Sequence, residues 1–331
     1  MNRYLWTQRA SKTLGRKNFC RLQSYLKYFL TFRHDYTSFP KHKINAQRTA
    51  IFFIDGKTIH GGLSDRLRGL FSVYYYCQKR NIEFKLYWVY PFKLQEYLLP
   101  NKVNWLIEKK DISYNRKEVA FRFFNSYSFM NNNEKDYFKV MDTSKNILHI
   151  YSNVTIHEDM FQSFFTDLFK PSEILKSNIE KCLQEIGGKY ISIAFRFISL
   201  LGDFEDTYSK FGILNPEEKE DYIEHSIKII NELYKKHSNI DKILVTSDST
   251  LFLTRAAKLP FVYIVPGTIT HIDNAKTENS ENAELKTFLD MLMISKAELC
   301  YCYSYKRMFR ATKFARTAAL IGGRKFIEIK E

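Results

Sequence analysis

The sequence predicts an α/β fold made of two domains, each with a parallel β-sheet covered by helices. In the second half of the chain, short apolar runs rich in β-formers alternate with amphipathic helical stretches. Strands of a parallel sheet are buried on both faces, so they read as unbroken apolar runs, as Tyr190–Phe195 does. The length of 331 residues and the 45% hydrophobic content are sufficient for two cores. We place the domain boundary at Gly187-Gly188, between a predicted helix and that strand.

The first predicted domain covers residues 48–187. It opens with a compact apolar strand, Thr49–Ile54, and a glycine-containing loop. Leu63–Lys79 then shows apolar residues at helical spacing, so the domain begins as strand, loop and helix. The remaining elements expected here are strands at Phe84–Val89, Val119–Phe124 and Ile147–Tyr151, a short helix at Pro91–Leu99, and a helix at Glu173–Ile186 capped by Ser172.

The second predicted domain covers residues 188–331 and shows the alternation more clearly. After its first strand, Pro216 starts a long helix to about His237, with acidic residues in the first turns where the helix dipole favours them. The other expected elements are strands at Ile243–Thr246, Phe261–Val265, Glu298–Cys302 and Lys325–Ile329, helices at Thr250–Lys258, Glu284–Ile294 and Lys306–Ile321, and a polar loop at residues 273–283.

The positive charge is concentrated at the N-terminus. Residues 1–50 hold eleven Lys or Arg and one acid, Asp35, so they carry +10 of the net charge of +15. We therefore predict a basic, helical N-terminal extension over residues 1–47. Three partners fit such a helix: an anionic membrane surface, the body of the protein, or nucleic acid. Its apolar face is expected to consist of Leu22, Tyr25, Leu26, Phe29 and Leu30.

Cysteine usage and hydropathy indicate the cellular compartment of the protein. The five cysteines are scattered and include no CxxC pair, which argues for a reducing environment and against a zinc site or a disulfide framework. We find no secretory signal and no apolar run near 18 residues. The expected location is the cytoplasm, with peripheral contact at the inner face of the plasma membrane.

Arg196, directly after the strand Tyr190–Phe195, is the first candidate site residue. In open α/β sheets, ligands bind beyond the carboxyl ends of the strands. A carboxylate cluster that includes Asp203 and Glu205 follows the arginine at a short distance. The alternative is an arginine that forms only a structural salt bridge with a nearby acid.

Three further stretches could contact an anionic ligand. Gly61 and Gly62 allow close backbone approach at the start of a helix. Ser247-Asp248-Ser249 follows a strand and offers hydroxyls and a carboxylate to a nucleotide, or else caps the next helix. Residues 310–316 offer a hydroxyl, Thr312, among cations, or else form a solvated basic face.

Taken together and in this order, the four stretches resemble the fucosyltransferase superfamily, which includes nodulation, α1,6-, α1,2- and protein O-fucosyltransferases. The resemblance covers about residues 50–330 and implies a GT-B type fold, in which two Rossmann-like domains face each other across a cleft. The segments that carry it are HGGLSDRLRGL, YISIAFRFISLLGDF, ILVTSDSTLFL and FRATKFARTAALIGGRKF.

The resemblance also implies roles for individual residues. Arg196 would hold the β-phosphate of a GDP-sugar, and Asp203 would be the first candidate for the catalytic base, ahead of Glu205 and Asp65. Ala194 stands where the family usually has histidine, Phe197 replaces a frequent second arginine, and the spacing from Arg196 to Asp203 is longer. The residues expected to contact the donor are Gly61, Gly62, Arg196, Ser247, Asp248, Ser249, Thr312 and Phe314.

The function that this resemblance implies is that of an inverting, metal-independent fucosyltransferase. It would use GDP-fucose as donor and modify a surface glycan, with the first domain binding the acceptor. No Asp-x-Asp motif lies beside a suitable strand, so cations and helix N-termini would replace a metal, and no cofactor is expected. Two alternatives remain: a GT-B transferase with another nucleotide sugar, and a non-catalytic nucleic-acid-binding protein. Against the second, the basic charge lies outside the folded halves and no RNA-binding motif is visible.

Overall fold

The structure is a computed structural model of the 331-residue chain. It describes residues 22, 26, 30, 35–37, 47–58, 60–124, 133–204, 212–269, 283–310 and 312–331. Most of the N-terminal extension, the candidate base Glu205, and all but the last residue of the polar loop expected at 273–283 lie outside the described residues.

The chain divides into two compact units. One comprises residues 1–61, 65–93 and 100–158, and the other comprises residues 62–64, 94–99 and 159–331. The units therefore divide near residue 158. Helices α5 and α6 group with the second unit because α5 packs on α10 and α6 packs on α9. The boundary at Gly187-Gly188, where α6 ends, stays a prediction. The helices named here are α5 (Phe161–Leu168), α6 (Glu173–Ile186), α9 (Ala283–Lys296) and α10 (Lys313–Ile321).

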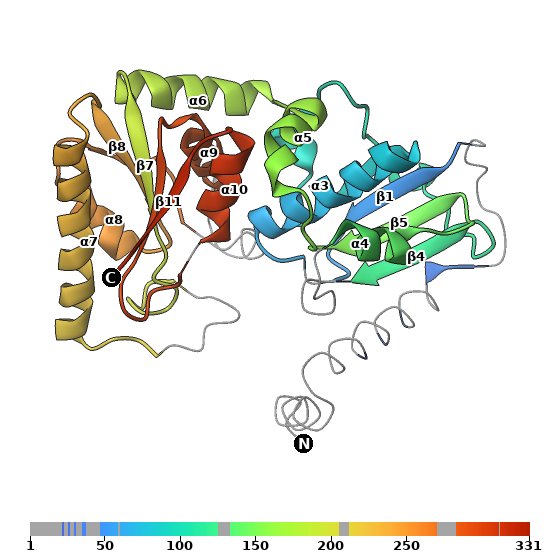
Figure 1. Cartoon of the computed structure of the whole chain (residues 1–331), viewed down its shortest axis with the longest axis horizontal. Helices are drawn as coiled ribbons and strands as arrows, with labels where there is room; N and C mark the ends of the chain where they lie inside the picture. The colour runs from blue at the N-terminus through green and yellow to red at the C-terminus, as the bar shows by residue number, and fades with distance from the viewer. Residues whose placement is uncertain are drawn as a thin grey trace. The chain divides into compact units, whose positions relative to one another are not determined.

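The first unit contains a four-stranded sheet in the order β2-β1-β5-β4, and every pairing in it is parallel. All six residues of β1 are buried, as the apolar run predicts. The chain enters β2 from β1 through helix α3, and β5 from β4 through helix α4 (Figure 1). The bounds are β1 (Thr49–Ile54), α3 (Leu63–Arg80), β2 (Glu83–Trp88), β4 (Val119–Phe124), α4 (Glu134–Met141) and β5 (Ile147–Ser152).

The helix predicted over Pro91–Leu99 is wrong. Only one 3₁₀ turn, Leu94–Glu96, forms there, and strand β3 (Leu98–Pro100) follows it. β3 pairs with β6 (Phe169–Pro171), which lies far away in the sequence. This long-range pairing overrides the local helical pattern, and Pro100, which has no N–H to donate, ends the strand.

The second unit contains a five-stranded parallel sheet in the order β11-β10-β7-β8-β9. Helices α7 and α8 lie on one face, and α9 and α10 lie on the other (Figure 1). Right-handed crossovers account for the two faces, because the chain proceeds from β7 towards β9 and then returns to β10 on the other side of β7. The bounds are β7 (Tyr190–Phe195), α7 (Pro216–Lys236), β8 (Lys242–Ser247), α8 (Thr250–Ala256), β9 (Val262–Tyr263), β10 (Cys300–Ser304) and β11 (Phe326–Lys330).

Several helix ends follow directly from local sequence. The side chain of Ser172 accepts a hydrogen bond from the Leu175 N–H, and α6 ends at Gly187 with a left-handed φ of 83°. Asn215 and Glu218 form a reciprocal capping box ahead of α7. These caps confirm the predicted bounds of α6 and the predicted start of α7.

The predicted start of the last helix is wrong. α10 begins at Lys313 rather than Lys306, because residues 305–309 form a turn in which Lys306 has a left-handed φ of 45°. A helix cannot include such a residue. The strand expected over Phe261–Val265 is also shorter and spans only Val262–Tyr263.

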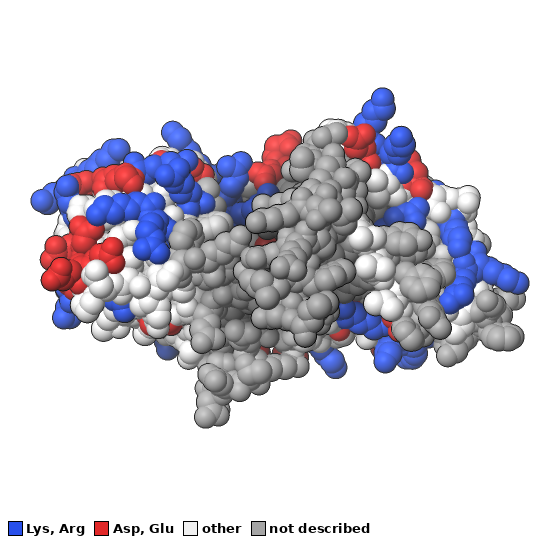
Figure 2. All heavy atoms as spheres, turned by 90° about the horizontal axis from the view of Figure 1, so that it is seen from below, with Lys and Arg blue, Asp and Glu red and all other residues white. Residues whose placement is uncertain are grey.

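The described surface mixes the two signs of charge. On the face shown in Figure 2, Lys and Arg side chains lie interspersed with Asp and Glu. This fits the small charge excess of +5 that remains outside residues 1–50. Among the described helices, none has the length and apolarity needed to cross a bilayer.

Candidate functional site

The candidate site of the second unit lies where the direction of its sheet connections reverses. β7 is followed by β8 on one side, and β10 lies on its other side and leads on to β11. Ligands of open α/β sheets bind at the carboxyl ends of the two strands that flank such a reversal. Arg196 directly follows β7, and the segment with Thr312 follows β10. The sheet topology therefore places both predicted donor-contact segments at one position.

Arg196 is fixed through its main chain and keeps part of its side chain in solvent. Its carbonyl accepts a hydrogen bond of 3.0 Å from the N–H of Phe309, in the segment after β10. Its guanidinium Nη1 lies 3.8 Å from Oδ2 of Asp248, and its Cζ lies 5.6 Å from the ring centroid of Phe204. The side chain is 29% exposed, so the cation is within reach of a ligand.

Asp248 holds the turn that carries Arg196. The residue is 7% exposed, and its two carboxylate oxygens accept the N–H groups of Phe197 and Ile198, each at 2.8 Å. Ile198 has a φ of +59°, which a β-branched residue adopts only when its surroundings hold it there. Burial raises the pKa of Asp248, while the positive charge of Arg196 opposes that rise. Contact of Asp248 with a nucleotide stays a prediction.

Asp203 and Ser249 meet at the start of α8. Ser249 Oγ accepts the Phe252 N–H at 3.1 Å and donates to Asp203 Oδ2 at 2.9 Å. The same Asp203 oxygen accepts the Leu251 N–H at 2.7 Å. The helix-cap role weighed for residues 247–249 is thus present. Ser247 Oγ also takes part, because it accepts the Ser249 N–H at 3.1 Å.

Thr312 and Phe314 lie at the N-terminus of α10. Thr312 is buried, occupies the N-cap position and makes no side-chain cap hydrogen bond, while Phe314 is half-buried. The first N–H groups of a helix have no partner within the helix and favour anions. Arg310, just before this point, is exposed. The nucleotide contacts of Thr312 and Phe314 stay predictions.

In the first unit, the loop before α3 is held by a buried arginine. Arg66 donates from Nε to the Gly61 carbonyl at 2.9 Å and from Nη1 to the Tyr90 carbonyl at 2.8 Å. Gly61 has a φ of +75°, and a Cβ there would lie 3.1 Å from the side chain of Asp65. A Cβ at Gly62 would meet nothing within 4 Å. Gly61 thus lies next to Asp65 in the first turn of α3, and the donor contacts of Gly61 and Gly62 stay predictions.

Sequence reasoning missed a polar cluster at the carboxyl ends of β1 and β5. Tyr151 donates from its hydroxyl to Asp55 Oδ2 at 2.8 Å, and His60 Nε2 lies 3.8 Å from Asp55 Oδ1. Burial alone raises the pKa of Asp55, but its interactions with His60, the Lys57 N–H and Tyr151 outweigh it and hold the pKa below its usual value. The one available signal was the position of Asp55 directly after a buried strand.

Across the residues that the structure describes, no three His, Cys, Asp or Glu side chains gather into a possible metal-binding group. No protein-family model and no curated protein matches this sequence.

Solved structures do match. The NodZ α-1,6-fucosyltransferase soaked with GDP-fucose aligns with a TM-score of 0.51 at 15% identity, over 83% of this chain and 92% of that one. A second structure of the fucosyltransferase NodZ, from Bradyrhizobium, gives 0.50 at 14% identity, over 84% and 94%. A mutant of Arabidopsis thaliana FUT1 in complex with GDP gives 0.53 at 11% identity, over 98% and 79%. The chain shares the GT-B type fold of these structures. The GT-B expectation from sequence is thereby confirmed, and at these identities the likeness concerns the fold.

Proposed function

We propose that this chain is a glycosyltransferase that uses a GDP-sugar, GDP-fucose in the first place, as donor. Two of the matching structures contain GDP-fucose or GDP by their own description. The observation that carries the proposal is the partly exposed guanidinium of Arg196 at the β7–β10 reversal of a sheet with this fold. A cation at that position suits the diphosphate of a nucleotide sugar.

In the proposed reaction, these residues stabilise the leaving group. As the acceptor hydroxyl attacks, a bond from its oxygen to sugar C1 forms and the bond from C1 to the diphosphate oxygen breaks. Negative charge then grows on the departing GDP, where Arg196 and the N–H groups at the start of α10 offset it. Attack from the face opposite the diphosphate inverts the anomeric carbon.

A carboxylate must take the proton of the acceptor hydroxyl as the new bond forms. Asp203 remains our first candidate, ahead of Glu205 and Asp65. Its Oδ2 accepts hydrogen bonds from Ser249 and Leu251, which hold the carboxylate in place at the start of α8. No metal is needed in this scheme, since the guanidinium and the helix N-terminus supply the positive charge.

Replacing Arg196 by alanine tests the proposal. We expect Arg196→Ala to lower the rate of GDP release from GDP-fucose by a factor of at least about 10². Arg255→Ala is the matched control, because Arg255 also lies in the second unit but pairs with Glu220 on the surface. Equal activity in the two variants would refute the role of Arg196. A thermal-shift panel of GDP- and UDP-sugars tests the alternative donor, since a ligand at 100 times its Kd stabilises by about 2.7 kcal/mol.

The extension is proposed to bring the enzyme to the inner face of the plasma membrane, where it would modify a surface glycan. Leu22, Leu26 and Leu30 follow one another at helical spacing and are 43%, 48% and 55% exposed. Exposed leucines beside the +10 charge of residues 1–50 fit an anionic lipid surface better than a helix packed on the protein body.

Vesicle flotation distinguishes the partners of the extension. We expect binding to phosphatidylserine-containing vesicles that is lost in Leu26→Asp, and little binding to phosphatidylcholine alone. Unchanged flotation of Leu26→Asp would contradict the apolar contribution. Salt-sensitive binding to RNA, unaffected by Leu26→Asp, would favour the nucleic-acid alternative instead.

A further inference from the structure

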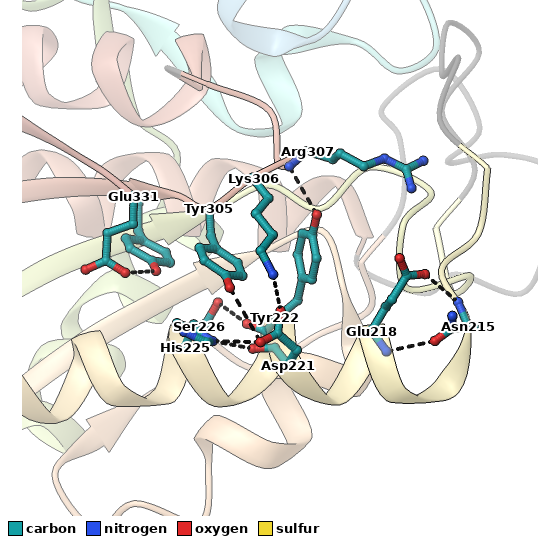
Figure 3. Close-up of polar contacts among 11 residues, drawn as sticks. Asn215, Glu218, Asp221, Tyr222, His225, Ser226, Tyr305, Lys306, Arg307 and Glu331 are labelled. Carbon is teal, nitrogen blue, oxygen red and sulfur yellow. Dashed lines mark hydrogen bonds and ion pairs between the residues drawn. The ribbon is translucent and has the colours of Figure 1, made fainter.

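Helix α7 holds the start of the segment that joins β10 to α10. We call residues 305–310 and 312 the β10–α10 loop. The backbone N–H of Arg307 donates to the hydroxyl of Tyr222 at 3.1 Å, and Lys306 Nζ donates to Asp221 Oδ2 at 2.8 Å (Figure 3). Asp221 and Tyr222 are neighbours on α7, and Tyr222 is buried in the core of the second unit. The loop is therefore fastened to the helix by one main-chain contact and one side-chain contact.

Further contacts fix the first residue of the loop. The ring of Tyr305 stacks on His225 of α7 with centroids 4.3 Å apart and planes 12° apart, and its hydroxyl donates to Asp221 Oδ1 at 3.4 Å (Figure 3). Lys306 donates its N–H to the carbonyl of Glu331 at 3.2 Å. With its left-handed φ, Lys306 directs the chain sharply over the surface of α7.

The other end of the loop reaches the candidate donor site. Met308 is buried, and its N–H donates to the Tyr305 carbonyl at 2.9 Å, which closes the turn. The next residue, Phe309, donates its N–H to the carbonyl of Arg196. The chain then continues to Thr312 and the N-terminus of α10. The contacts from Tyr222 therefore lead through a few residues of tightly turned backbone to both groups that are proposed to meet the diphosphate.

We propose that Asp221 and Tyr222 are positioning residues for the terminal phosphate of the nucleoside diphosphate. They touch no substrate. They act by holding the β10–α10 loop so that Arg196 and the first N–H groups of α10 face the same phosphate. This inference rests on the proposed function and extends it to a helix face that is not part of the site. Preorganised donors are effective only when their supporting contacts keep them in place.

Comparison of GDP with GMP separates positioning from a merely structural role. GMP lacks the β-phosphate that Arg196 and α10 are proposed to bind. A loosened loop should weaken the binding of GDP and leave the binding of GMP nearly unchanged. General damage to the second unit should weaken the binding of both. The ratio of the two dissociation constants is therefore the informative readout.

The experiment is calorimetric titration of the full chain with GDP and with GMP. Tyr222→Phe removes the hydroxyl that accepts the Arg307 N–H, and its control is Tyr234→Phe, on the same helix, where the ring stacks on Phe261. Asp221→Asn weakens the pair with Lys306, and its control is Glu232→Gln, which weakens the pair of Glu232 with Lys228 within α7. We expect the GDP dissociation constant to rise about 3- to 10-fold in both test variants and to change less than 2-fold in both controls, as for the loss of one hydrogen bond.

Each outcome either supports or contradicts the positioning role of Asp221 and Tyr222. The positioning role is overturned if GDP and GMP binding are weakened equally, or if the dissociation constants of the test variants change no more than those of the controls. Should Tyr222→Phe fail to fold, Asp221→Asn carries the test alone, since Asp221 is partly exposed. A wild-type chain without GDP affinity rejects the proposed function together with this inference. A wild type that prefers GDP, and loses that preference in Arg196→Ala but not in Tyr222→Phe, rejects this inference alone.

Discussion

The hydroxyl of Tyr36 lies 2.6 Å from Nδ1 of His149, which joins the end of the N-terminal extension to the central strand β5 of the first sheet. Burial lowers the pKa of His149 to about 3, so the ring is neutral. Thr37 adds a β-bridge to Asn115, and Asp35 forms an ion pair with Lys57, close after β1. Residues 35–37 are therefore an integral part of the first unit, although the sequence assigns them to the extension.

Truncating the Tyr36 side chain should destabilise the first unit. Tyr36 is 2% exposed and packs in the core cluster of that unit, so we expect Tyr36→Ala to reduce the free energy of unfolding by about 3–5 kcal/mol. Tyr36→Phe should cost only about 1–2 kcal/mol, because it leaves the buried His149 Nδ1 without its partner. Urea unfolding followed by tyrosine and tryptophan fluorescence measures both. A chain beginning at residue 38 with unchanged stability would contradict this prediction.

His149 should make stability fall as the solution is acidified. Its folded-state pKa of about 3 lies below the unfolded value near 6.5, so below pH 6.5 the unfolded chain binds a proton that the folded chain does not. The contribution of the neutral His149 ring to the free energy of unfolding is complete above pH 6.5 and is lost as the pH falls towards 3. The slope from this group approaches about 1.4 kcal/mol per pH unit.

The measurement for His149 is urea unfolding at pH 5, 6 and 7, compared with His149→Gln. The glutamine cannot titrate, so its stability profile should be flatter over this range, whatever the absolute loss from the substitution. Parallel profiles for the two proteins would show that other groups cause the pH dependence.

Asp248→Asn should impair donor binding through Arg196. The amide presents one acceptor oxygen where the carboxylate presents two, so one of the N–H groups of Phe197 and Ile198 loses its partner. We expect a loss of about 1–3 kcal/mol in stability and weaker GDP binding.

A double-mutant cycle with Arg196→Ala shows which role Asp248 plays. If Asp248 acts only by positioning the arginine, its substitution has no further effect on GDP affinity once Arg196 is alanine. Additive losses would instead indicate that Asp248 contacts the nucleotide itself, as the resemblance to fucosyltransferases implies.

Asp203→Asn distinguishes a catalytic base from a helix cap. The amide oxygen can still accept the Leu251 N–H, but it cannot take a proton from the acceptor. We expect transfer to fall by about 10²–10⁴ with a small change in melting temperature. Ser249→Ala, which removes the N-cap hydroxyl of α8, should lower the free energy of unfolding by about 1 kcal/mol and leave the Asp203 carboxylate available as a base. Full activity of Asp203→Asn would remove it from the list of bases.

The elements that sequence predicted well are those with local signals. β1 and β7 are unbroken apolar runs, and α6 has Ser172 and Gly187 at its ends, so their bounds agree with the structure. The errors at Pro91–Leu99 and at the start of α10 arise where distant segments decide the local conformation: β6 pairs with β3, and α7 holds the turn at Lys306.

The same distinction applies to the site. Arg196 could be found because it follows a recognisable strand. The contact of Asp55 with Tyr151, and that of Tyr36 with His149, join residues whose pairing no local pattern reveals. The hydrogen bonds of Asp248 to the turn after β7 likewise depend on β8 lying beside β7, which alternation of strands and helices alone does not specify.

The hydrogen bond between the Phe309 N–H and the Arg196 carbonyl has a consequence for biosynthesis. β8 lies beside β7, and both precede β10 and the segment after it in the chain. The Arg196 turn therefore gains its hydrogen bond from Phe309 only after β10 has been translated. A nascent chain arrested before residue 300 would contain Arg196 but would lack the Phe309 N–H that supports its carbonyl, however well its first unit had folded.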